Sequence, residues 1–162
     1  MEKKDSSQTH FQKTFKRGAA MRGFSFWQKW LFVVSLIICC FGLLMAFWGG
    51  TVLFQVFNDQ VDKVFWGSAQ VPNQAANFRQ WIYGVLGATM AGWGVFLAFI
   101  VQYPFKRKEK WAWNCLLSGL GIWFVVDTFI SIYHTVYFNA FFNIVLMIAL
   151  IVPLIFTRIH FR

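Results

Sequence analysis

Six polar or charged side chains are expected to meet near the ends of three apolar segments: Asp127, Ser131, His134, Asn139, Asn143 and Arg79. Asp127 is the one acidic residue inside an apolar segment, and Ser131 and His134 follow it four and seven residues later. That spacing places the three on one face of an α-helix. Asn139 and Asn143, again four residues apart, begin the next segment after a short turn. The sequence therefore predicts a carboxylate, an imidazole and two amides at one level of the protein, with a guanidinium within reach.

Three hypotheses account for this cluster. A carboxylate in hydrocarbon costs at least about 2.5 kcal/mol, so Asp127 is expected to face other helices, a water-filled cavity or a cation. In the first hypothesis, hydrogen bonds between helices fix the helix register, with Asp127 either neutral or paired to Arg79 or His134. In the second, the cluster binds or translocates a proton, a cation or a small polar ligand, because carboxylates and histidines are common parts of proton relays. In the third, it is a catalytic or metal site.

Motifs for cofactors and catalysis give no support to the third hypothesis. One histidine and one aspartate are too few for a tetrahedral zinc site, and no second membrane histidine is present to ligate haem beside His134. Cys39 and Cys40 are adjacent and Cys115 is distant, so the chain has no C-x-x-C pair and free thiols are expected. The motifs of phosphate loops, zinc proteases and serine hydrolases do not occur either. The sequence predicts no metal, no cofactor and no catalytic residue.

The amino-acid composition indicates whether water or lipid surrounds the helices that carry this cluster. Hydrophobic residues make up 58% of the 162 residues and charged residues 13%, against about 25% charged in an ordinary soluble domain. The core of a soluble domain of 162 residues is too small to bury 21 phenylalanines and nine tryptophans. These values exclude a soluble enzyme, a disordered chain and a disulfide scaffold, and they indicate a lipid environment.

Four charge-poor runs predict membrane-spanning helices at about 27–54, 81–103, 111–133 and 137–157. Each supplies the roughly 20 apolar residues that a helix needs to cross about 30 Å of hydrocarbon. Strands of a membrane barrel would be shorter and would alternate apolar with polar residues. We therefore predict an all-α integral membrane protein, a four-transmembrane-helix bundle formed by residues 27–162.

The basic residues predict the orientation of the bundle. Seven of them precede the first span, four lie between the second and third spans, and two follow the fourth, whereas only Lys63 and Arg79 lie in the connection after the first span. This pattern places both termini in the cytoplasm and favours the plasma (inner) membrane of a bacterium. The formal net charge of +9 is then explained by orientation and by anionic lipid headgroups, without nucleic acid as a partner.

Two segments are expected outside the membrane. Residues 1–26 are basic and poor in branched aliphatic side chains, which predicts a disordered cytoplasmic arm. The outer loop, residues 55–80, begins with apolar side chains at helical spacing, which indicates either an extension of the first span or a helix on the outer surface. Its second half carries Gly67, Pro72, three Gln and two Asn, and it is predicted to be a loop that acts as a simple connector or as a lid.

Small residues on the second span predict helix packing, because close backbone approach drives association in lipid. They form two neighbouring stripes that share one residue: Gly84, Ala88, Ala91 and Gly92 in the first, and Gly87, Ala91, Gly94 and Ala98 in the second. The second span is therefore expected to be central in the bundle or to mediate a homo-oligomer or contact with another membrane protein.

The leading functional hypothesis is a small non-enzymatic scaffold or accessory subunit, because packing stripes are abundant and no complete catalytic set is present. The alternative is a transporter or channel for a proton, cation or small polar ligand that uses the cluster around Asp127 and His134. The third is a membrane enzyme that acts on a lipid or a quinone.

Overall fold

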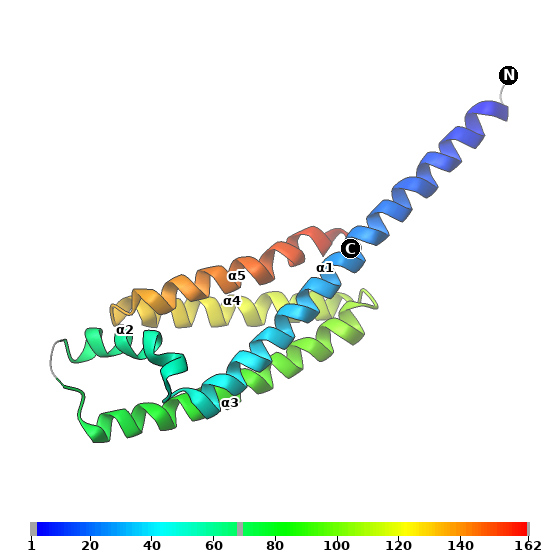
Figure 1. Ribbon diagram of the computed structural model, residues 1–162. Helices are drawn as coiled ribbons and strands as arrows, with labels where there is room; N and C mark the ends of the chain where they lie inside the picture. The colour runs from blue at the N-terminus through cyan, green and yellow to red at the C-terminus, as the bar shows by residue number, and fades with distance from the viewer. Residues whose placement is uncertain (1–2, 68–69, 162) are drawn as a thin grey trace.

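A computed structural model describes the backbone of residues 3–67 and 70–161, and the side chains of these ranges from Gly23 onward. Within these ranges every regular element is helical (Figure 1). The long helices are α1 (Lys3–Trp48), α3 (Asn73–Ile100), α4 (Lys110–Tyr133) and α5 (Tyr137–Thr157). The short ones are the 3₁₀ turn η1 (Val52–Phe54), α2 (Gln55–Phe65), the π-helical turn η2 (Val101–Phe105) and the 3₁₀ turn η3 (Arg158–Phe161).

The prediction of four helices long and apolar enough to cross a membrane is confirmed. These segments are Gly23–Trp48, Asn73–Phe105, Lys110–Tyr133 and Tyr137–Phe161. The boundaries of the first two differ from the prediction. The first helix ends at Trp48, where Gly49 and Gly50 follow it. Helix α3 begins at Asn73, directly after Pro72, whose backbone is extended (φ −59°, ψ 142°) and caps the helix. The polar residues from Asn73 to Gln80 are therefore helical, although the sequence predicts a loop there.

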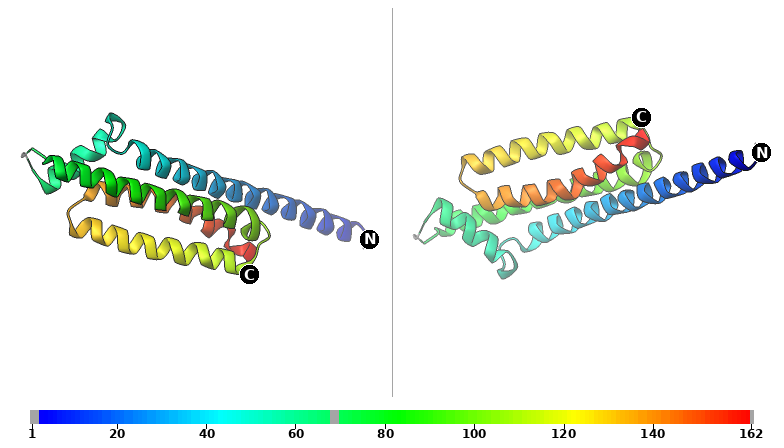
Figure 2. Two further views of the ribbon diagram at one scale, coloured as in Figure 1. Left: turned by 90° about the horizontal axis from the view of Figure 1, so that it is seen from below. Right: turned by 90° about the horizontal axis from the view of Figure 1, so that it is seen from above.

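The four long helices run alternately up and down, with short turns between α3 and α4 and between α4 and α5 (Figures 1 and 2). The α3–α4 turn and the C-terminal end of the described chain share one end of the bundle, and α1 continues past that end. Helix α1 packs against both α3 and α5, and α4 packs against α5. Helices α3 and α4 meet through large side chains, with the rings of Trp93 and Trp123 5.5 Å apart.

The N-terminal part of α1 projects alone beyond the other helices, as the dark blue segment in Figure 1 shows. Its 46 residues form one uninterrupted helix of roughly 69 Å at about 1.5 Å per residue. The sequence predicts disorder for residues 1–26, whereas the structure has helix from Lys3 onward. The segment contains no proline, and its four Lys, two Gln and two Ala are residues that permit helix. How this arm behaves in solution stays a prediction.

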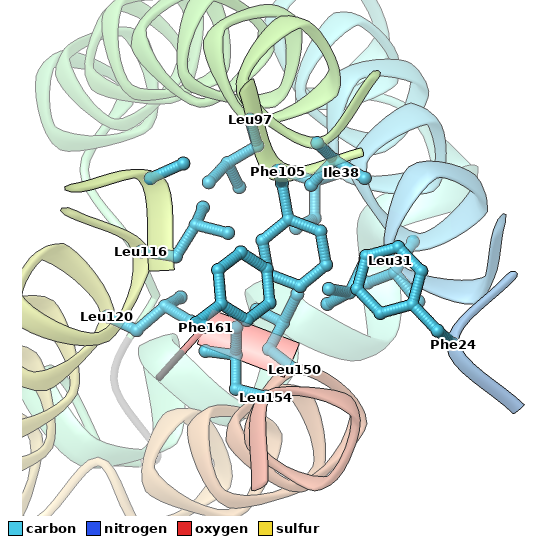
Figure 3. Close-up of a cluster of buried hydrophobic side chains, with 13 residues drawn as sticks. Phe24, Leu31, Ile38, Leu97, Phe105, Leu116, Leu120, Leu150, Leu154 and Phe161 are labelled. Atoms are coloured by element: carbon cyan, nitrogen blue, oxygen red, sulfur yellow. The ribbon is translucent and has the colours of Figure 1, made fainter. Parts of the chain in front are cut away.

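The core of the bundle is built from aliphatic and aromatic side chains of all four long helices (Figure 3). Leu31, Leu120, Leu150 and Leu154 are each at most 2% exposed. Three phenylalanines close the end of the core that lies nearest the C-terminus. The rings of Phe105 and Phe161 are 4.7 Å apart, and Phe24 lies within 6.0 Å of both. The core therefore holds the helices together at that end.

Helices α1 and α3 touch backbone to backbone through one of the two predicted stripes. A Cβ atom added to Gly87 would lie 2.5 Å from the amide nitrogen of Ala46, and one added to Gly94 would lie 2.6 Å from that of Cys39. Ala91, on the same stripe, is buried against Gly42. Residues of this size are required here, because any larger side chain would push the two helices apart.

The residues that belong to the other stripe alone have no such role within the chain. A Cβ at Gly84 would meet its nearest atom at 3.9 Å, one at Gly92 would meet nothing within 4 Å, and Ala88 is exposed. The small residues of α3 are thus divided between an inner contact with α1 and an outer surface.

Candidate functional site

The turn between α4 and α5 sets the level at which their polar residues meet. The amide of Thr135 donates to the carbonyl of Ile132 at 3.0 Å, and the amide of Val136 donates to that of Ser131 at 2.8 Å. This pair of bonds is the Schellman arrangement that ends many helices. Thr135 has a φ of +59°, a left-handed conformation for which glycine is the usual residue. Because the reversal is so tight, the last two turns of α4 face the first two turns of α5.

The carboxylate of Asp127 is the centre of a hydrogen-bond network between these two helices. Its Oδ1 atom accepts hydrogen bonds from Nδ2 of Asn139 at 2.8 Å and from Nδ2 of Asn143 at 2.9 Å. Asn139 also donates to Oγ of Ser131 at 2.8 Å, and Asn143 donates to Oγ1 of Thr128 at 3.4 Å. The two protons of each amide are therefore both used, and both amides join α5 to α4.

Ser131 completes the network from within α4. Its Oγ atom lies 2.7 Å from the backbone oxygen of Asp127 and 3.2 Å from Oδ1 of the same residue, so its one proton serves one of these acceptors at a time. Ser131 and Asn143 are 6% and 5% exposed, Asp127 is half-buried, and Asn139 is exposed. The network thus extends from the surface of the bundle into the α4–α5 interface.

The structure brings together four of the six residues that the sequence places in this cluster, adds Thr128, and separates two others. His134 is the C-terminal cap of α4, about two turns beyond Asp127, and its side chain makes none of the hydrogen bonds of the network. Its exposed ring lies 5.0 Å from the ring of Tyr133 and 6.3 Å from that of Phe65. Arg79 also lies elsewhere, since its guanidinium forms an ion pair with Asp62 of α2. Asp127 is therefore paired with amides rather than with a histidine or an arginine.

Sequence reasoning missed a second polar contact, which holds α2 against the bundle. Besides the Asp62–Arg79 ion pair, Nδ2 of Asn58 donates to the carbonyl of Gly49 at 3.4 Å. Asn58 is 8% exposed, and its Oδ1 atom has no hydrogen-bond partner within the described ranges. The signal was present in the sequence, because Asn58 and Asp62 are four residues apart and share a face of the predicted helix.

Aromatic side chains place α2 across the end of the bundle away from the C-terminus (Figure 1). The ring of Phe57 lies 5.1 Å from that of Phe138, 5.4 Å from that of Phe142 and 6.1 Å from that of Phe41. Helix α2 therefore bridges α1 and α5 at the level of the α4–α5 turn, close to the Asp127 network. The first half of the predicted outer loop is a helix packed on the bundle.

A buried glutamine on α1 is a further residue that the sequence did not single out. Nε2 of Gln28 donates to the carbonyl of Val101 at 3.4 Å and to Oε1 of Gln102 at 3.2 Å, and Gln28 is 5% exposed. Pro104 lies within the same π-helical turn and cannot donate a backbone hydrogen bond. Gln28 thus supplies a donor where the backbone of α3 is irregular.

The described residues contain no group of three or more His, Cys, Asp or Glu side chains that could hold a metal ion. All three cysteines, Cys39, Cys40 and Cys115, are free thiols. Comparison with protein-family models, with curated proteins and with solved structures gives no match for this chain. The functional argument therefore depends on the geometry of the chain itself.

Proposed function

We propose that this chain is an integral membrane protein that serves as a small scaffold or accessory subunit, with both termini in the cytoplasm. Four helices have the length and hydropathy to cross a membrane. Large apolar side chains are exposed along them, for example Phe96, Ile122, Ile148 and Phe156, each more than half exposed. A soluble monomer rarely exposes so much contiguous apolar surface, whereas lipid accepts it. Membrane insertion is thus the simplest account of the surface.

The network around Asp127 supports a structural role over transport or catalysis. The carboxylate accepts hydrogen bonds from the side-chain amides of Asn139 and Asn143 on the neighbouring helix. The same amides also donate to the hydroxyl oxygens of Ser131 and Thr128. Hydrogen bonds between helices in lipid are each worth about 0.6–2 kcal/mol. The one carboxylate within the four apolar segments therefore fastens α4 to α5.

Isolation from native membranes in a mild detergent, followed by native mass spectrometry, tests the proposal. A scaffold or accessory subunit is expected in the membrane fraction and in particles that contain more than one chain. A chain recovered outside the membrane fraction would refute membrane insertion. A strictly monomeric, partner-free particle would refute the scaffold or subunit role.

A further inference from the structure

Helix α5 contains a proline, Pro153, close to its C-terminal end. Proline has no amide proton, so it cannot donate to the carbonyl of the residue four positions earlier, which is Ala149. Ala149 lies twelve residues before Phe161, the end of the fourth apolar segment, or about 18 Å at about 1.5 Å per residue. In lipid at this depth no water supplies the missing donor, and an unpaired carbonyl is costly.

The missing donor comes from another helix. Nε1 of Trp30, on α1, donates to the carbonyl of Ala149 at 3.0 Å. This is the one carbonyl that Pro153 deprives of its helical partner. The indole of Trp30 therefore takes the place of the amide proton that proline lacks.

The end of α5 has a second free carbonyl and a second indole. Where α5 passes into the 3₁₀ turn η3, the amide of Arg158 donates to the carbonyl of Ile155, one position later than an α-helix requires. The carbonyl left over is that of Leu154, and Nε1 of Trp113, on α4, donates to it at 2.9 Å. The end of α5 lies beside the start of α4 (Figure 2).

An ordinary interfacial role does not account for Trp30. Tryptophans near the ends of membrane spans usually direct their polar edge to the headgroup region. Trp111 has such a polar partner near the helix start, since its Nε1 atom donates to Oε2 of Glu109 at 2.6 Å. The indole of Trp30 instead donates to the backbone of a neighbouring helix, although its side chain is 44% exposed.

We propose that Trp30 is a latch through which α1 sets the position of residues 153–161, which we call the C-terminal segment. An amide proton of α5 would move with α5, whereas an indole on α1 moves with α1. Helix α1 is continuous from Lys3 to Trp48 and projects past the end of the bundle where the C-terminal segment lies (Figure 1). The position of the C-terminal segment therefore depends on that of α1. The inference goes beyond the proposed scaffold role and uses the proposed membrane insertion only for the absence of water around Ala149.

A double-mutant cycle tests whether the indole replaces the missing amide. Trp30→Phe keeps an aromatic ring but removes the donor, and it is expected to lower the melting temperature in detergent by about 2–4 °C. Pro153→Ala gives the carbonyl of Ala149 a partner within α5. In that background Trp30→Phe should lower the melting temperature by less than half as much.

Trp113→Phe is the matched control, because its acceptor, the carbonyl of Leu154, gains no partner from Pro153→Ala. The decrease in melting temperature caused by Trp113→Phe should be the same in both backgrounds. An equal decrease for Trp30→Phe in both backgrounds would overturn the inference. The inference would also be overturned if Pro153→Ala reduced the effects of Trp30→Phe and Trp113→Phe to the same extent.

Pulsed electron paramagnetic resonance tests whether the bond sets the position of the C-terminal segment. One spin label is attached to Cys40 on α1 and the other to Ile159→Cys, in a variant whose other two cysteines are replaced by alanine. Both positions are exposed, and each lies ten residues from the Trp30–Ala149 bond on opposite sides, so the labels are about 30 Å apart at about 1.5 Å per residue. The distance distribution is expected to broaden at least twofold in Trp30→Phe and to narrow again when Pro153→Ala is added. An unchanged distribution in Trp30→Phe would overturn the latch, whether or not the chain proves to be a scaffold.

Discussion

Gly42 of α1 and Gly87 of α3 lie so close that neither position has room for a methyl group. A Cβ atom on Gly87 would lie 2.5 Å from the carbonyl oxygen of Gly42, and one on Gly42 would lie 2.6 Å from the carbonyl oxygen of Gly87. Both obstacles are backbone atoms, so a side-chain rotation cannot relieve the clash. This mutual contact makes α1 and α3 the most tightly joined pair of helices in the bundle.

Substitution of Gly87 is therefore expected to be destabilising. Gly87→Ala forces the two backbones apart and should cost about 1–3 kcal/mol of unfolding free energy. Thermal melting in detergent measures the effect. Gly92→Ala on the same helix is the matched control, because its Cβ would meet nothing, and it should be neutral or stabilising by up to about 1 kcal/mol. Equal melting of the two variants would contradict the close approach of α1 and α3.

Substitutions of Asp127 separate the structural hypothesis from the transport hypothesis. Asp127→Asn keeps a side-chain oxygen that accepts from Asn139 and Asn143, so melting temperature and cellular function should both be preserved. Asp127→Ala leaves the buried amide of Asn143 without its acceptor and should cost about 1–3 kcal/mol. His134→Ala should change neither quantity, because the imidazole lies outside the network. If Asp127→Asn instead abolished cellular function, measured as growth or flux, while its melting temperature stayed normal, a proton or cation site would be favoured.

The turn between α4 and α5 offers a stabilising substitution. Thr135 adopts a left-handed conformation that costs an ordinary residue about 1–2 kcal/mol, and glycine avoids this cost. Thr135→Gly is expected to raise the melting temperature by an amount equivalent to about 1 kcal/mol. Thr135→Ala keeps a Cβ atom and should show no such gain, so a similar rise in both variants would point to loss of the threonine side chain instead.

Reporter fusions test the orientation of the bundle. Alkaline phosphatase is expected to be active when fused at residue 70 and inactive at residues 108 and 162, because basic residues are concentrated before the first span, between the second and third spans and after the fourth. A cytoplasmic reporter such as green fluorescent protein should give the opposite pattern at the same positions. The reverse of both patterns would overturn the predicted topology.

The sequence predicted what depends on local spacing. The four apolar runs predicted the number of long helices. The pairs Asp127–Ser131 and Asn139–Asn143 predicted four members of the hydrogen-bond network, because a short turn leaves α4 and α5 little freedom to shift relative to each other. It did not predict the partner of Arg79, because that depends on where α2 folds after Gly49 and Gly50. It also did not separate His134 from the network, because a shared helical face does not show whether side chains seven residues apart are close enough to touch.

Because α1 and α3 are in close contact and α4 is packed more loosely, the helices should separate in a defined order under force. Helices α1 and α3 meet at backbone distance, whereas α4 is held by side chains, with two indole rings toward α3 and an amide network toward α5. A bundle with such unequal contacts separates in stages rather than all at once. When the chain is pulled out of a bilayer by its C-terminus, α5 and α4 should leave the membrane first. Helices α1 and α3 should leave last, together as one hairpin.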